Sequence, residues 1–194
     1  MRRAWLAATV IAVIAAIATP TRADIDGDSF ERALWGWTVS LNAPTNWSPI
    51  EERSYPSILV WLVRRDPPGK MLLTAEQLDD SLDASQYAKK TSVLLEALGF
   101  TARKPQLHAQ TGAYWIDFDN GEVYLRQAFL VIGDVGYALT LSARNSRTRG
   151  QHLRAFDYAL RSIKIKRGKP ITKIRAADPA AADAGPEPDA EPEQ

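Results

Sequence analysis

Cysteine is absent from this chain of 194 residues, and the absence removes several kinds of chemistry. Without a thiol there is no disulfide, no thiolate nucleophile, no metal held by cysteine and no lipid attached through sulfur. Histidine is nearly absent too, because only His108 and His152 occur, far apart in the sequence. A metal centre needs three or four convergent ligands. We therefore expect no metal, no cofactor and no catalytic histidine.

The common catalytic motifs are also missing. The sequence has no G-x-S-x-G, no H-E-x-x-H and no glycine-rich phosphate loop. Its 45% hydrophobic and 24% charged residues are ordinary for a globular protein, and its length allows one core domain. These absences predict a protein that is not an enzyme. The alternative is a hydrolase that uses carboxylates, whose acids the sequence does not pair.

No apolar run reaches the roughly 20 residues that a membrane-spanning helix needs. Instead, Met1–Ala23 is typical of a secretory signal, with Arg2 and Arg3 before an apolar run and small residues before a cleavage point after Ala23. The sequence therefore predicts an exported protein, periplasmic or extracellular. The alternative is that the signal stays uncleaved as an anchor.

Charge is balanced over the whole chain but segregated near its end. Residues 144–175 hold eleven bases and one acid, Asp157, whereas residues 176–194 hold six acids and no base. The basic segment 144–175 is a solvated helix face with a linker, or a docking patch for an anionic lipid or envelope polymer. A nucleic acid is a third possible partner, which export from the cytoplasm argues against.

Composition divides the chain into three parts. Residues 1–23 are the predicted signal peptide and residues 24–167 the predicted folded domain. Residues 168–194 are a basic linker followed by an Ala/Pro/Asp/Glu tail, which cannot bury enough apolar surface to fold and is predicted to be disordered.

The stretch from Gly112 to Ala143 predicts three antiparallel strands. Asn120-Gly121 is typical of a two-residue type I′ hairpin turn, and Gly133 to Gly136 predict a looser second turn. A two-residue turn at Asn120-Gly121 would place Asp117 opposite Tyr124 and Trp115 opposite Arg126. Both faces of the resulting sheet are largely apolar, so we expect a covering layer on each.

Other elements follow from periodicity and end signals. Asp83 is a candidate N-cap and Gly99 a candidate C′ residue for a helix between them. The remaining expected elements are a helical turn at 28–34, a strand at 35–41, a buried strand at 58–63, a short strand at 71–74, a weak strand at 106–110, a helix at 148–161 and an edge strand at 162–166.

Four residues form the candidate binding site: Trp115, Asp117, Tyr124 and Arg126. Strand alternation places them on one face of the predicted sheet. Arg126 would stack on Trp115 and pair with Asp117, contributing about 0.5–2 kcal/mol if partly buried. One interpretation is that these contacts satisfy the cluster internally. The other is a ligand site, which requires the four side chains to line a pocket.

In the order of its elements the chain resembles the PsbP-like α/β/α sandwich family, which includes bacterial DcrB-type envelope proteins. The resemblance is carried by Val39 to Pro44 with Trp47, by Gln127–Val131, by Gly136–Thr140 and by Phe156 to Ile163. It implies an α/β (α+β) fold, a mostly antiparallel sheet with helices on both faces. Because members mostly bind proteins and share no catalytic centre, it also implies a binding or assembly factor that contacts another envelope protein. The alternative function is binding of a small ligand or an anionic lipid.

Overall fold

A computed structural model gives the structure of residues 29–51, 54–78, 82–144 and 146–168, without the side chains of residues 146 and 147. The predicted signal peptide and the predicted acidic tail lie outside these residues. In chain order the elements are β1 (Ser29–Leu34), β2 (Trp37–Asn42), β3 (Ser48–Glu51), β4 (Ile58–Arg64), β5 (Gly69–Gln77), α2 (Ala84–Ala97), β6 (Thr101–Ala102), β7 (Gln106–Leu107), β8 (Tyr114–Asp119), β9 (Tyr124–Ile132), β10 (Val135–Ala143), α3 (Ser146–Ser162) and β11 (Lys164–Arg167).

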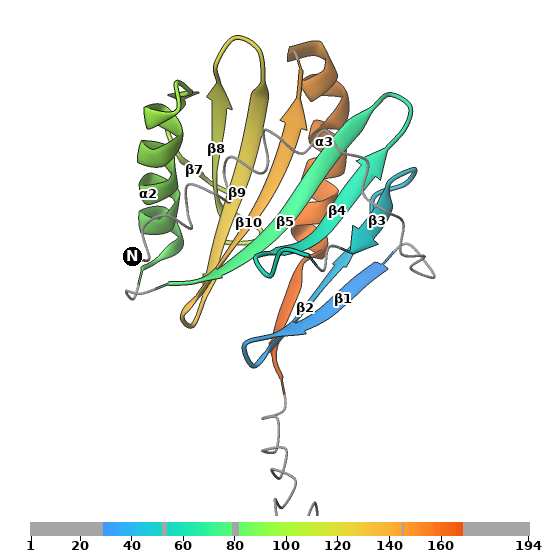
Figure 1. Cartoon of the computed structure of the whole chain (residues 1–194), viewed down its shortest axis with the longest axis vertical. Helices are drawn as coiled ribbons and strands as arrows, with labels where there is room; N and C mark the ends of the chain where they lie inside the picture. Colours follow the sequence, from blue (N-terminus) through green and yellow to red (C-terminus); the bar gives the residue numbers. More distant parts are fainter. Residues whose placement is uncertain (1–28, 52–53, 79–81, 145, 169–194) are drawn as a thin grey trace, which may run out of the picture.

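The described strands form two sheets, and every pairing between them is antiparallel. The large sheet has the order β3-β4-β5-β10-β9-β8-β6, with β7 also paired to β8. The small sheet has the order β1-β2-β11, so it joins the first and last described strands (Figure 1). The predicted three-strand meander is confirmed as β8, β9 and β10, and the buried strand predicted at 58–63 as β4.

The predicted register of the β8–β9 hairpin is wrong by two residues. Asp117 lies opposite Arg126, and Asp119 lies opposite Tyr124, so four residues form the loop instead of two. The Asn120 side chain accepts hydrogen bonds from the backbone N–H groups of Glu122 and Val123, at 3.1 and 2.8 Å. This side-chain capping stabilises a longer turn than Asn-Gly alone predicts. Because the shift is two residues, every side chain keeps its predicted face.

The helical turn predicted at 28–34 is also wrong, since these residues form β1 from Ser29 onward. The reason is a tight hairpin: Leu34 pairs with Trp37, and both residues between them have positive φ, 49° for Trp35 and 78° for Gly36. That backbone is the one a two-residue type I′ turn requires. The second strand consequently begins at Trp37 and not at Trp35.

Helix α2 confirms its predicted ends. The Asp83 side chain accepts from the Gln86 N–H, and the Gln86 side chain accepts from the Asp83 N–H, each at 2.8 Å, which is a capping box. At the other end Gly99 has φ +86°, and the Phe100 N–H donates to the Leu95 carbonyl at 3.1 Å. Polar side chains at the start and a residue with left-handed backbone conformation at the end thus provide hydrogen-bond partners for the backbone N–H and C=O groups that have none within the helix.

The two helices pack with different sets of core residues. Tyr87 and Leu95 of α2 pack in one cluster with Phe129 of β9, whereas Phe156 of α3 packs in another with the adjacent Ala128. The prediction is confirmed in its coarser form, a mostly antiparallel sheet with two helices. Among the described residues no helix combines the length and apolar character needed to cross a membrane.

Helix α3 connects the two sheets. It contacts β10, β5 and β9 of the large sheet and β2 of the small sheet. At its last residue, the Ser162 hydroxyl accepts from the Asn42 N–H at 3.0 Å and lies 3.1 Å from the Asn42 carbonyl. The chain then runs directly into β11, and the Gly168 N–H donates to the Gly36 carbonyl at 2.7 Å. The end of the described chain is therefore fixed beside the β1–β2 turn.

Candidate functional site

The four predicted site residues come together on one face of β8 and β9. Arg126 donates from Nε to Oδ1 of Asp117 at 2.7 Å and from Nη2 to Oδ2 at 2.8 Å. This two-pronged geometry is the strong form of an arginine–carboxylate pair. The Arg126 guanidinium also lies 3.9 Å from the centre of the Trp115 ring. The predicted ion pair and cation–π contact are thus both present, with Asp117 directly opposite Arg126.

Sequence reasoning missed a fifth member, Arg149 of α3. Its guanidinium lies 3.9 Å from the centre of the Tyr124 ring, donates to the Tyr124 hydroxyl and reaches Oδ2 of Asp117 at 3.5 Å. No sequence signal connected a base in the helix to an acid 32 residues earlier. Only the packing of α3 against the large sheet brings them together.

The cluster satisfies its own charges. The Asp117 side chain is 5% exposed, and both of its oxygens are used by arginines whose side chains are 17% and 20% exposed. A buried carboxylate is tolerable only when paired in this way. The geometry agrees with the interpretation that the contacts are internal and that the cluster fixes α3 to β8 and β9. Ligand binding by these four residues stays a prediction.

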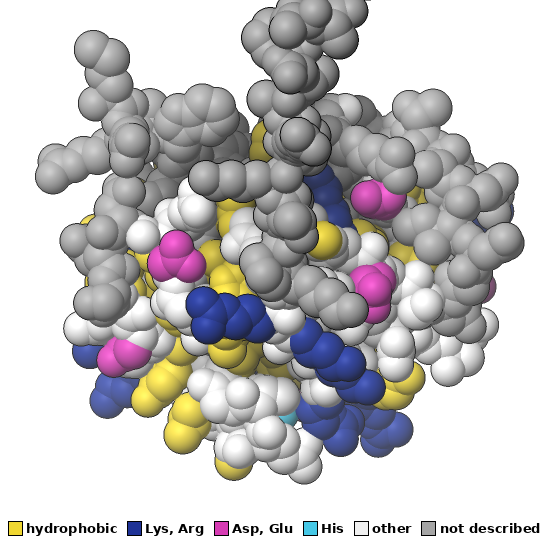
Figure 2. Space-filling model, turned by 90° about the horizontal axis from the view of Figure 1, so that it is seen from below, with side chains coloured by type: hydrophobic (Ala, Val, Ile, Leu, Met, Phe, Trp, Pro, Cys, Tyr) yellow, Lys and Arg dark blue, Asp and Glu magenta, His cyan; other side chains and the backbone are white. Residues whose placement is uncertain are grey.

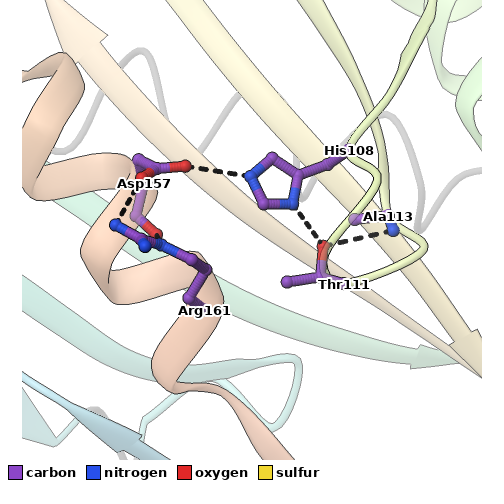
Figure 3. A network of polar contacts seen from close by, with 5 residues as sticks. All are labelled: His108, Thr111, Ala113, Asp157 and Arg161. Atoms are coloured by element: carbon purple, nitrogen blue, oxygen red, sulfur yellow. Dashed lines mark hydrogen bonds and ion pairs between the residues drawn. The ribbon is translucent and has the colours of Figure 1, made fainter.

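A second polar network fixes the other end of α3 to the turn after β7 (Figure 3). His108 contacts Oδ1 of Asp157 through Nε2 and the Thr111 hydroxyl through Nδ1, both at 2.9 Å. Arg161 pairs with the second oxygen of Asp157 at 2.6 Å. The Thr111 oxygen also accepts from the Ala113 N–H at 3.3 Å.

This arrangement has a simple proton assignment. Because the Asp157 carboxylate can only accept, Nε2 of His108 donates to it, and in the neutral imidazole Nδ1 then accepts from the Thr111 hydroxyl, whose oxygen accepts from the Ala113 N–H. A threonine, a histidine and an acid in a row resemble a nucleophile and its base. Here, however, the threonine oxygen closes a turn in which the Gly112 N–H donates to the His108 carbonyl at 2.9 Å. The network therefore holds the turn against α3.

His152 is a buried residue of the core. Its Nε2 lies 3.0 Å from the Pro68 carbonyl, and its ring meets the Trp47 ring edge-on at 5.2 Å. A Cβ on Gly69 would lie 2.7 Å from this ring, so the glycine is required for the close approach. Among the described residues no group of three or more histidines or acids is placed to hold a metal ion.

Glu76 and Tyr87 are in contact with each other, and the pKa of each is raised. Burial raises the pKa of Glu76 on β5, while the Tyr87 hydroxyl of α2 and the charge of Lys90 act in the opposite direction. Burial likewise raises the pKa of Tyr87 well above its usual value. The pair is a contact between β5 and α2 under the helix.

Exposed bases lie on α3 and on β11, which follow each other in the chain, and we call this set of residues the α3–β11 basic surface. Its charged members are Arg154, Arg161, Lys164, Lys166 and Arg167, and its exposed aromatic residue is Tyr158. Arg154, Tyr158 and Arg161 follow each other at helical spacing, so they share the outer side of α3. Figure 2 shows Lys and Arg side chains gathered at the end of the molecule where β11 lies.

Most of these bases have no partner within the fold. Arg161 pairs with Asp157, but the side chains of Arg154, Lys164, Lys166 and Arg167 make no hydrogen bond or ion pair with another described residue. β11 is an edge strand, as predicted, because it pairs only with β2 among the described strands. Lysines on such an edge oppose unwanted strand pairing. Within the described chain, the surface therefore carries positive charge that no acid neutralises, and it includes an exposed tyrosine.

Comparison with known proteins gives a likeness of fold. No protein-family model and no curated protein matches the sequence. Among solved structures the chain is similar to cyanobacterial PsbP (CyanoP) from Synechocystis sp. PCC 6803, with 13% identity and a TM-score of 0.46, over 77% of this chain and 99% of that one. It is also similar to LpqN, described as involved in cell envelope biogenesis of Mycobacterium tuberculosis, with 17% identity and a TM-score of 0.47, over 76% and 90% of the two chains.

A third similar structure comes from Bacteroides thetaiotaomicron, with 11% identity and a TM-score of 0.44; 73% of this chain matches 49% of that one. The similar structures thus include a PsbP protein and a protein described as involved in cell envelope biogenesis.

Proposed function

We propose that this chain is an exported, non-enzymatic binding or assembly factor of the bacterial cell envelope, with the α/β/α sandwich architecture. It acts by contact with another protein, and the contact surface is the α3–β11 basic surface. The observation that carries the proposal is a set of bases without a described partner, Arg154 on α3 and Lys164, Lys166 and Arg167 on β11, together with the exposed Tyr158 on a helix that is fixed by Arg149 and Asp157. Arginine and tyrosine are enriched at protein interfaces.

The charge of this surface selects the partner. Arg154, Lys164, Lys166 and Arg167 are exposed, and the one acid on the same stretch, Asp157, is already used by His108 and Arg161. A complementary partner therefore presents an acidic surface. The non-catalytic part of the proposal is supported by Asp117, the most deeply buried acid of the described chain, whose oxygens are both used by arginines.

Photo-cross-linking in intact cells tests the proposal. A photoreactive phenylalanine analogue replaces Tyr158, which is 47% exposed, and the control places it at Tyr55, which is 58% exposed and lies before β4. We expect a discrete cross-linked envelope protein from position 158 alone. Neutralising the surface with Arg154→Gln, Lys164→Gln and Lys166→Gln should abolish that product, because the contact depends on charge.

Two results would overturn this assignment. Equal products from positions 158 and 55 would show that the surface selects no partner. Binding of the purified chain to phosphatidylglycerol vesicles, lost in the same triple variant, together with no cross-linked protein, would assign the surface to a lipid. Fractionation of the cells checks the export part, because the mature chain is expected outside the cytoplasm and beginning at Asp24.

A further inference from the structure

The α3–β11 basic surface is joined to the most acidic part of the same chain by residues 169–175, which carry three further bases, Lys169, Lys173 and Arg175. The last described residue, Gly168, follows β11 and is fixed to Gly36. Beyond it, residues 176–194 carry six acids, namely Asp178, Asp183, Glu187, Asp189, Glu191 and Glu193, and no base. The first of these acids, Asp178, follows Gly168 by ten residues, so the acids begin close in sequence to a surface of opposite charge.

Length and geometry allow the two to meet. The 26 residues from 169 to 194 span at most about 90 Å when extended. Helix α3 has 17 residues and is thus about 25 Å long. The segment can reach every base of the surface, from Arg167 next to its attachment point to Arg154 on the outer side of the helix.

The α3–β11 basic surface offers unpaired bases beside the point where the acidic segment is attached. Four of its bases have no partner within the described fold, and Asp157 is already occupied. A tethered segment is present at an effective concentration in the millimolar range, so even weak ion pairs suffice for association. We infer that the acidic segment 176–194 binds the α3–β11 basic surface of its own chain and competes there with an external acidic partner. The inference uses the surface assigned above but does not require the partner to exist.

The absence of cysteine makes the test direct. Ala190→Cys places a single thiol between two acids of the tail, where a nitroxide spin label can be attached to the full chain. At low ionic strength we expect the label to broaden the amide NMR signals of Tyr158, Arg161 and Lys166. Signals of α2, on the remote part of the large sheet, serve as the internal reference. The broadening should disappear at about 0.5 M salt, because salt at that concentration screens interactions between exposed charges that are more than a few ångströms apart.

Two matched samples test whether the broadening depends on the tail acids and whether it arises within one chain. In the first, the six tail acids are replaced by Asn or Gln in the labelled chain, and we expect the broadening at Tyr158 to be lost. In the second, a chain that carries the nitroxide but has natural-abundance nitrogen is mixed with a nitrogen-15 chain that has no thiol and no nitroxide. We expect no broadening in this mixture, because the contact is within one chain.

The inference is overturned if the low-salt broadening is absent, is equal over α2 and α3, or survives neutralisation of the acids. Broadening in the mixed sample alone would show contact between chains instead. These readouts need no partner, so a failure of the cross-linking experiment and a failure of this one are separable. If both ideas hold, neutralising the tail increases the yield of the cross-linked product at position 158.

Discussion

Single residues explain how α3 is fixed to the large sheet. Asp117 accepts from Arg126 on the neighbouring strand and from Arg149 on the helix, so one carboxylate connects three elements. His108 and Asp157 make the second connection, two turns further along the helix. A carboxylate that is almost completely buried and shared in this way stabilises the fold chiefly because removing it leaves its partners unpaired.

The first prediction concerns that carboxylate. Asp117→Asn keeps the shape but removes the charge that two guanidinium groups share. We expect a loss of about 2–3 kcal/mol in the free energy of unfolding, less than the roughly 3–5 kcal/mol of fully buried pairs because both arginines are partly exposed. Urea denaturation measures it. Asp119→Asn, on the same strand but exposed, is the control and should stay within about 0.5 kcal/mol. Equal effects of the two would contradict the role of Asp117.

The second prediction compares two glycines. A Cβ at Gly69 would lie 2.7 Å from Nε2 of His152 and 2.8 Å from the Trp47 ring, whereas a Cβ at Gly150 meets nothing within 4 Å. Gly69→Ala should therefore destabilise by about 1–3 kcal/mol through overpacking. Gly150→Ala lies in α3 and should stabilise by about 0.5–1 kcal/mol, because alanine has the higher helix propensity. Thermal unfolding should show a lower melting temperature for Gly69→Ala and a higher one for Gly150→Ala. Melting temperatures that change in the same direction in both variants would refute the argument.

At the scale of elements, sequence reasoning was reliable where one local signal decides the structure. Asp83, Gln86 and Gly99 predicted both ends of α2, because capping uses only neighbouring residues. It failed at the β8–β9 turn, where the side chain of Asn120 stabilises a four-residue loop. It also failed at β1, whose strand conformation depends on pairing with β2 and on the positive φ of Trp35, a residue that rarely adopts it.

The candidate site shows the same limit. Alternation along two strands placed Trp115, Asp117, Tyr124 and Arg126 on one face, and a two-residue error in register left that unchanged. Arg149 could not be found in this way, because its contact with Asp117 depends on how a helix packs on the sheet. The basic segment was visible in the sequence. Which of its bases are exposed and unpaired was not.

The third prediction concerns pH and the contact between β5 and α2. Burial raises the pKa of Glu76 above its ordinary value of 4.5, so the folded protein binds this proton more tightly than the unfolded chain. The resulting stabilisation is present below about pH 4.5 and is lost as the pH rises through the raised pKa. Glu76→Gln does not titrate, so its stability relative to the native chain should increase with pH over this window. Thermal unfolding at a series of pH values measures the difference.

Tyr87 supplies the control for that experiment. Its hydroxyl donates to Glu76 and thus favours the charged carboxylate. Tyr87→Phe should therefore destabilise the protein more at neutral pH, where the carboxylate is charged, than at acid pH. A difference between Glu76→Gln and the native chain that stays constant from acid to neutral pH would show that Glu76 titrates alike in both states.

At the scale of the whole molecule, the two sheets share one core cluster. Val39 and Leu41 of β2 belong to the same cluster as Leu139 and Leu141 of β10 and Phe156 of α3. β2 and β10 are in different sheets and are not paired, and helix α3 contacts both of them. The small sheet also fixes both the start and the end of the described chain.

The fourth prediction follows from the shared cluster: the small sheet should unfold together with the large one. Leu41 is fully buried, and Leu41→Ala should cost about 2–5 kcal/mol through lost burial and the remaining cavity. If the sheets are one cooperative unit, native-state hydrogen exchange should show the same loss of protection in β2 and in β10, because both open only by global unfolding. Leu98→Ala, at a position 42% exposed after α2, is the control and should change neither strand. Protection lost in β2 and retained in β10 would show instead that the small sheet opens separately. The β11 part of the α3–β11 basic surface would then move independently of the part on α3.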